Sequence, residues 1–134
     1  MNELVNEWIE KAEGDFHSAL REYRARKNPN YDAAGFHAQQ SIEKYLKANL
    51  QIRNIRFDKV HDLLALMKLC LPFIPELEIH KELLSYLNPF AVAFRYPGES
   101  ATRDKALNAV KAMKTLRTYF REILDLPASQ KETT

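Results

Sequence analysis

Apolar residues recur at steps of three and four along most of this chain, a spacing typical of amphipathic helices. The pattern predicts helices over residues 3–26, 31–54, 61–71, 76 or 79 to 93, and 101–124. Pro89 lies inside the fourth of these and is expected to kink or split it. Helices joined by short connections favour an all-α fold, an antiparallel, up-and-down bundle of four to five helices.

The predicted breaks between helices fall at residues that disfavour helix. Asn28-Pro29-Asn30 ends the first helix, and Asn30 or Asp32 is expected to cap the second. Pro97-Gly98 marks a turn in the loop 95–100. We expect one helical domain over 1–126 and a disordered polar tail over 127–134.

The helix predicted at 31–54 differs from the others because two of its faces are partly apolar. It is therefore expected to lie at the centre of the bundle. Its third face is polar and carries His37, Gln40, Lys44 and Lys47 at spacings of three, four and three. These side chains suit either a solvated face or a surface for phosphates or an acidic partner.

Composition narrows the classes of function only a little. The chain has 134 residues, a formal net charge of +2 and three glycines, which fits one globular helical domain without a strongly basic surface. No apolar run is long enough for a membrane span, and no His or Cys spacing indicates a metal site. The single cysteine, Cys70, is expected to be a core residue, and a cytoplasmic location is predicted.

Four segments together resemble the HEPN family. The longest runs from Phe36 to Ala48 and reads Phe-His-Ala-Gln-Gln-Ser-Ile-Glu-Lys-Tyr-Leu-Lys-Ala, similar to the second helix of HEPN domains. It is accompanied, in the family's order, by Ala12 and Asp15 before it, and by His61-Asp62-Leu63-Leu64 and Arg95-Tyr96-Pro97 after it. The resemblance covers residues 5 to 124.

This resemblance implies a small helical bundle that forms homodimers. Many such proteins are paired with a minimal nucleotidyltransferase as toxin and antitoxin, and some bind nucleotides. Others are metal-independent ribonucleases that use an arginine and a histidine four to six residues later. Arg95 has no histidine in that window, whereas Arg56 and His61 match the spacing but lie between the second and third predicted helices.

The candidate site follows from the residues and the resemblance together. Ligand binding is predicted for Gln40, Lys44, Lys47, His61, Arg95 and Tyr96. A supporting polar network is predicted for Asp15, Gln39 and Glu43, bonded to Arg95 and Tyr96 or across a dimer seam. The alternatives are structural ones: Arg95 pairs with Asp15 or Glu43, and Asp62 or His61 caps the third helix.

The sequence thus predicts a dimeric binding module without metal or cofactor, which takes nucleotide or RNA phosphates, a nucleotidyltransferase partner, or both. It is predicted to be non-catalytic because the Arg–His ribonuclease motif is incomplete. The alternative is a metal-independent endoribonuclease toxin that uses Arg95 or Arg56 with His61.

Overall fold

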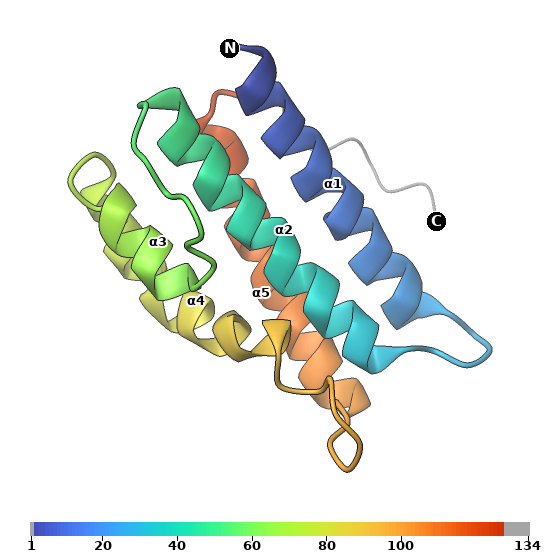
Figure 1. Cartoon of the computed structure of the whole chain (residues 1–134). Helices are drawn as coiled ribbons and strands as arrows, with labels where there is room; N and C mark the ends of the chain where they lie inside the picture. The colour runs from blue at the N-terminus through green and yellow to red at the C-terminus, as the bar shows by residue number, and fades with distance from the viewer. Residues whose placement is uncertain (1, 128–134) are drawn as a thin grey trace.

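The computed structural model describes residues 2–127, and its regular elements are all helices (Figure 1). The α-helices are α1 (Glu3–Arg24), α2 (Tyr31–Ile52), α3 (Leu63–Cys70), α4 (Lys81–Leu87) and α5 (Arg103–Ile123), with 3-10 helices η1 (Pro75–His80) and η2 (Asn88–Ala91). The predicted all-α bundle is confirmed. Apart from Pro127, the predicted tail 127–134 lies outside the described residues.

The helices begin where polar side chains satisfy their first backbone N–H groups. Asn30 caps α2 by accepting from the Ala33 N–H at 2.9 Å. Asp62 caps α3: its Oδ1 accepts hydrogen bonds from the backbone N–H groups of Leu64 and Ala65 at 2.9 and 3.0 Å. Of the two predicted caps, Asp62 and His61, the structure thus shows Asp62. Asp32, the other candidate cap of α2, instead accepts a hydrogen bond from the Ala101 N–H just before α5.

Helix α2 is the centre of the bundle, as predicted. It packs against α1, α3, α5 and η2, and more than half of its residues are buried. In Figure 1, α1 lies on one side of α2, α3 and α4 lie on the other, and α5 runs behind it. Few solvent-facing positions remain on α2, so the polar residues it carries must find partners within the protein.

The connection between α2 and α3 departs from strict up-and-down alternation. Residues 53–62 run back along α2, so that α3 sets off in the same general direction as α2 (Figure 1). His61, near the end of this connection, therefore contacts Glu43 and Lys47, which lie about two and a half turns and one and a half turns before the end of α2. A sequence pattern does not show this return, because the connection has no periodic apolar stripe.

The fourth predicted helix is divided, as expected from its proline. Helix α4 ends at Leu87, and Pro89 lies within the 3-10 turn η2. The ring of Phe90 in η2 then packs on α2 at Gly35. A β-carbon at Gly35 would lie 2.9 Å from Phe90 Cε2 and closer still to Cδ2. Only glycine at position 35 permits this approach.

Cys70 is a core residue, as expected. Its thiol is buried, and burial raises its pKa to about 12, which keeps it protonated and inert at neutral pH.

Within residues 2–127, no helix combines the length and the apolar character that crossing a membrane requires.

A buried ionic cluster ties α1, α2 and α5 together; we call it the Glu13 cluster. The Glu13 carboxylate accepts hydrogen bonds from the Arg117 guanidinium, with Nε at 2.7 Å, and from the Tyr45 hydroxyl. Arg121 donates to the Tyr45 hydroxyl at 3.1 Å and lies 3.6 Å from Glu13. Arg117 also lies over the Phe16 ring, 4.0 Å from its centroid. The cluster matches one carboxylate to two guanidinium groups.

We predict that Glu13→Gln lowers the free energy of unfolding by about 2–3 kcal/mol, because it leaves the buried Arg117 guanidinium without its counter-charge. Urea unfolding followed by circular dichroism measures the change. Glu10→Gln is the matched control, since Glu10 lies in the same helix with an exposed side chain. Equal effects of the two substitutions would contradict the prediction.

The same cluster predicts a pH dependence. Burial by itself raises the pKa of Glu13, but hydrogen bonds from Arg117 and Tyr45 and the charges of Arg117 and Arg121 outweigh it and lower that pKa below its ordinary value. The contribution of the Glu13 carboxylate to the free energy of unfolding is therefore complete above the pKa of Glu13 in the unfolded chain, about 4.3. It is lost as the pH falls through the lower pKa that Glu13 has in the folded protein. The stability difference between wild type and Glu13→Gln should accordingly shrink as pH is lowered from 5 toward 2.

Gly35→Ala is expected to destabilise the protein, because overpacking costs about 1–3 kcal/mol and exceeds the gain in helix propensity of about 1 kcal/mol. Gly14→Ala provides the opposite control: no atom lies within 4 Å of its would-be β-carbon in α1, so this change should be stabilising. Thermal unfolding of both variants measures the two signs, and a stabilised Gly35→Ala would contradict the packing described.

Candidate functional site

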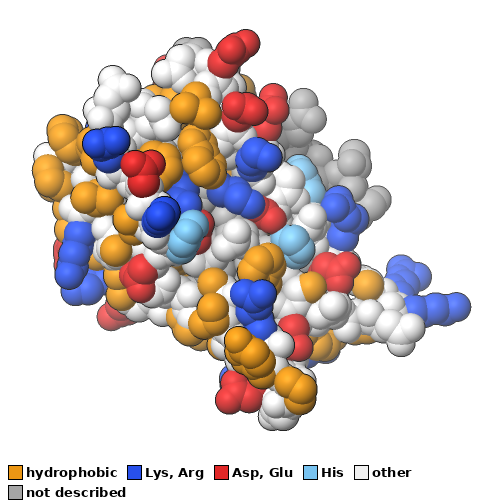
Figure 2. Space-filling view, in the orientation of Figure 1, with side chains coloured by type: hydrophobic (Ala, Val, Ile, Leu, Met, Phe, Trp, Pro, Cys, Tyr) orange, Lys and Arg blue, Asp and Glu red, His pale blue; other side chains and the backbone are white. Residues whose placement is uncertain are grey.

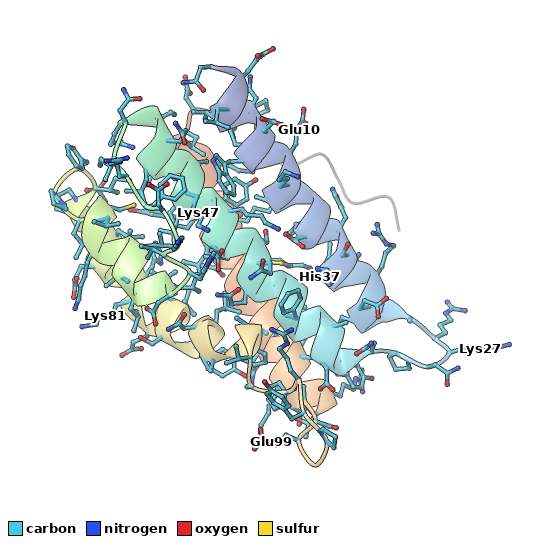
Figure 3. The ribbon with its side chains drawn as sticks, in the orientation of Figure 1. Glu10, Lys27, His37, Lys47, Lys81 and Glu99 are labelled. Atoms are coloured by element: carbon cyan, nitrogen blue, oxygen red, sulfur yellow. The ribbon has the colours of Figure 1, made fainter. Side chains whose placement is uncertain are left out.

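Polar side chains gather along one side of α2, between α1 and the returning connection 53–62. We call this group the α2 polar cluster; its members are Asp15, His37, Gln40, Glu43, Lys44, Lys47 and His61. Figure 2 shows histidine, lysine and arginine side chains beside carboxylates on this face. Figure 3 labels His37 and Lys47, both of which project from α2 on the viewer's side.

One part of the cluster centres on Glu43. Its carboxylate accepts a hydrogen bond from the Lys47 ammonium at 3.0 Å and lies 3.2 Å from Nδ1 of His61. Lys47 Nζ is also 3.3 Å from that same Nδ1. Glu43 and Lys47 are buried, whereas the His61 side chain is 69% exposed. The carboxylate therefore holds one nitrogen of an imidazole that is otherwise largely exposed.

Aromatic rings cover the Lys47 ammonium. Its Nζ lies 5.4 Å from the Trp8 ring centroid and 5.8 Å from that of Phe57, within the range of cation–π attraction. The two rings meet edge to face, 5.7 Å apart. This contribution cannot be predicted from sequence spacing, because Trp8 reads as part of the apolar stripe of α1 and Phe57 belongs to a connection without periodicity.

The other part of the cluster centres on Asp15 of α1. Its carboxylate lies 2.8 Å from His37 Nδ1 and accepts a hydrogen bond from the Lys44 ammonium. Asp15 and Lys44 are largely buried, and the His37 side chain is 31% exposed. His37 and Lys44 are seven residues apart, almost two full turns of α2, so they lie on the same face and one carboxylate can bridge them.

Two glutamines lie beside the Glu43 part of the cluster. Gln40 donates from Nε2 to Gln39 Oε1 at 2.8 Å and lies 3.5 Å from Glu43 Oε1. Gln39 is fully buried, and its Nε2 makes no hydrogen bond within residues 2–127. The predicted bonds from Gln39 and Glu43 to Arg95 and Tyr96 are absent from the described chain, since Glu43 binds Lys47 and His61 instead.

Arg95 lies in a separate hollow, which we call the aromatic groove. It measures about 390 Å³ and is lined by Phe36 and Ala33 of α2, by Phe90 and Phe94, by Arg95, and by Asn30 and Asp32 at the start of α2. Phe90 and Phe94 have centroids 5.5 Å apart and an interplanar angle of 58°. Lys105 of α5 lies over the Phe94 ring at 5.6 Å.

Arg95 is an exposed cation with no ion pair in the part of the chain that the structure describes. The expected structural pairings with Asp15 or Glu43 are not formed, because both carboxylates are taken by residues of the α2 polar cluster. Tyr96 is 74% exposed. The guanidinium is thus available to an anion from outside the chain.

No direct contact joins Arg95 or Tyr96 to Gln40, Lys44, Lys47 or His61 within residues 2–127. The expected ligand residues are divided between the aromatic groove and the α2 polar cluster. The two are neighbours along α2, however, because Phe36 of the groove lies one turn, about 6 Å of helix rise, before Gln40. A chain of linked phosphates can reach both, whereas a single small ion cannot.

Arg56 does not complete a ribonuclease pair with His61 in this conformation. Its guanidinium lies 3.8 Å from the Asp58 carboxylate, and both side chains are almost fully exposed. No contact between Arg56 and His61 occurs. Among residues 2–127, no three His, Cys, Asp or Glu side chains converge in a way that could hold a metal ion.

The geometry supports two kinds of chemistry. The unpaired Arg95 beside three phenyl rings suits a phosphate attached to a planar group. The carboxylate-held imidazole of His61 has the form of a proton-transfer group, but no free arginine accompanies it.

Comparison with protein families supplies the identity that the geometry leaves open. The model of the HEPN domain matches residues 5–123, nearly the whole chain. Comparisons with curated proteins and with solved structures return no match. The matched region contains every member of the α2 polar cluster and the aromatic groove, and the chain therefore belongs to the HEPN family.

Proposed function

We propose that this HEPN domain is a non-catalytic binding module that takes the phosphates of a nucleotide or RNA. The observation that carries the proposal is the unpaired Arg95 in the aromatic groove, one helical turn from the α2 polar cluster. Arginine binds phosphate through two parallel N–H donors, and an ion pair within the protein would remove those donors. No such ion pair is formed within the described residues.

The lysines of the α2 polar cluster have a secondary part in this proposal. Lys44 and Lys47 are each paired with a carboxylate, so they contribute little net positive potential. Gln40 and His61 present polar groups at the edge of the cluster, and Tyr96 lies exposed beside Arg95. We assign the primary phosphate contact to Arg95, and secondary contacts along the strand to Gln40, Lys44, Lys47, His61 and Tyr96.

The HEPN family also supports a dimer and a protein partner as parts of the proposal. Val92 and Tyr96 are 59% and 74% exposed next to the groove, which suits an interface with a second copy. Light scattering should then give twice the chain mass of 15.6 kDa.

A minimal nucleotidyltransferase is the proposed partner, in a toxin–antitoxin system of the cytoplasm. Co-purification with such a protein encoded by a neighbouring gene tests this part.

Arg95→Gln is expected to weaken binding to a fluorescent single-stranded RNA about tenfold, and to lower the slope of log affinity against log salt by about 0.7, because one phosphate contact is lost. Fluorescence anisotropy at several salt concentrations measures both. Lys68→Gln removes the same charge from the exposed face of α3, a helix that contributes no residue to the lining of the aromatic groove, and should change neither. RNA binding that is absent, or equally weakened in both variants, would count against the proposal.

A specific observation also supports the ribonuclease alternative. Glu43 holds His61 Nδ1 at 3.2 Å, the arrangement in which a carboxylate orients an imidazole for proton transfer. The alternative needs Arg95 or Arg56 to approach His61, which neither does in this structure. Since the proposal is non-catalytic, we expect RNA incubated with the protein in EDTA to stay intact. Cleavage that disappears in His61→Ala would reverse the ranking of the two functions.

A further inference from the structure

The aromatic groove carries features that a simple phosphate site does not need. Phe36, Phe90 and Phe94 form much of its wall, and Phe90 is held against α2 by the close approach at Gly35. The rings of Phe90 and Phe94 are inclined by 58° rather than stacked on each other. A flat ligand can therefore lie on the face of one ring and meet the edge of the next. The volume of about 390 Å³ falls in the range of small-ligand sites.

A carboxylate faces the same groove as these rings. Asp32 accepts a hydrogen bond from the Ala101 N–H through Oδ1, which fixes its side chain and leaves Oδ2 without a bond in the described chain. An ionised carboxylate only accepts hydrogen bonds, so it selects a ligand edge that presents N–H donors. It repels an edge that presents a lone pair.

The charges along the groove are arranged for a ligand with two different ends. Arg95 forms no ion pair with any of residues 2–127, and Lys105 adds a second positive charge over Phe94. Asp32 is the acidic group on the lining. A ligand that fits must combine an anion, a planar aromatic body and an edge of N–H donors.

We infer that the aromatic groove binds a guanine nucleotide, with the base against the phenyl rings, its N–H edge at Asp32 and its phosphate at Arg95. Guanine offers adjacent N1–H and N2–H₂ donors on one edge. Adenine and cytosine instead place a ring nitrogen acceptor beside their amino group, which would face the Asp32 carboxylate unfavourably. This inference rests on the proposed phosphate-binding function, because Arg95 serves in both.

The test titrates guanosine, adenosine and cytidine 5′-monophosphates and inorganic phosphate into the whole protein by calorimetry. We expect the guanosine nucleotide to bind at least about tenfold more tightly than the other two. Phe94→Leu should weaken all three nucleotides about tenfold and leave the affinity for inorganic phosphate unchanged. Arg95→Gln should weaken every ligand.

Asp32→Asn isolates the recognition of the base. Asparagine keeps an oxygen acceptor for the Ala101 N–H and so preserves the contact between α2 and α5, but it presents an amide donor to the ligand. It should abolish the preference for guanine at an unchanged melting temperature. Asp125→Asn, at the exposed C-terminal end of α5, removes the same charge about 30 Å away along that helix and should leave the preference intact.

The outcomes separate this inference from the function on which it rests. Equal affinities for the three nucleotides, together with equal affinities for short 5′-phosphorylated RNAs that begin with G or with A, all dependent on Arg95, would overturn guanine recognition and leave the phosphate-binding function standing. A guanine preference that survives Asp32→Asn, together with nucleotide affinities that Phe94→Leu leaves unchanged, would overturn the placement of the base in the groove. No binding of any nucleotide or RNA would overturn both.

A second pair of probes distinguishes a free nucleotide from the end of an RNA chain. Short 5′-phosphorylated RNAs that begin with G or with A are compared with the free nucleotides. A preference seen with the free guanosine nucleotide assigns the groove to mononucleotides. A preference seen only with the RNAs assigns it to a terminal guanosine, and either result supports guanine recognition.

Discussion

The burial of charged side chains on α2 constrains the rest of this structure. Lys44 is matched by Asp15 of α1, and Glu43 is matched by Lys47 and His61. A buried charge without a partner costs several kcal/mol, about 3–5 when one member of a pair is removed. The positions of α1 and of the connection 53–62 against α2 are therefore set by ion pairs as well as by apolar contact, because each supplies a partner for a charge on α2.

This pairing also decides where the protein can bind an anion. The lysines of α2 are the most prominent cations of the Phe36–Ala48 segment, yet their charges are largely neutralised within the protein. Arg95, in an irregular loop outside the bundle core, keeps its charge unpaired within the described chain. Rings from α2, η2 and the following turn gather beside it because glycine at position 35 lets η2 approach α2. The stable centre and the candidate binding surface thus come from different groups of residues on one helix and its neighbours.

In the Glu13 cluster, too, polar side chains position helices against α2, here α1 and α5. Tyr45 lies in the apolar interior, where burial and the hydrogen bond to Glu13 raise its pKa to about 12, so it remains a neutral donor at any physiological pH. Its hydroxyl joins Glu13 of α1 to Arg121 of α5. Helices α1 and α5, which contact each other less than either contacts α2, are therefore also connected through the polar end of one buried aromatic side chain.

The four HEPN-like segments of the sequence indicated the family. Apolar periodicity and capping residues predicted the helices, the central place of α2 and the break at Pro89, and they narrowed the caps to Asn30 or Asp32 and to Asp62 or His61. These depend on local backbone preferences and on a periodic apolar pattern, which neighbouring residues express directly. Three contacts became visible only in the folded chain. Asp15 and Glu43 hold the cations of α2, residues 53–62 return His61 to the middle of that helix, and Arg95 lies with Phe36, Phe90 and Asp32. Those contacts join residues far apart in the chain, and their geometry depends on side-chain packing between helices, which no local spacing encodes.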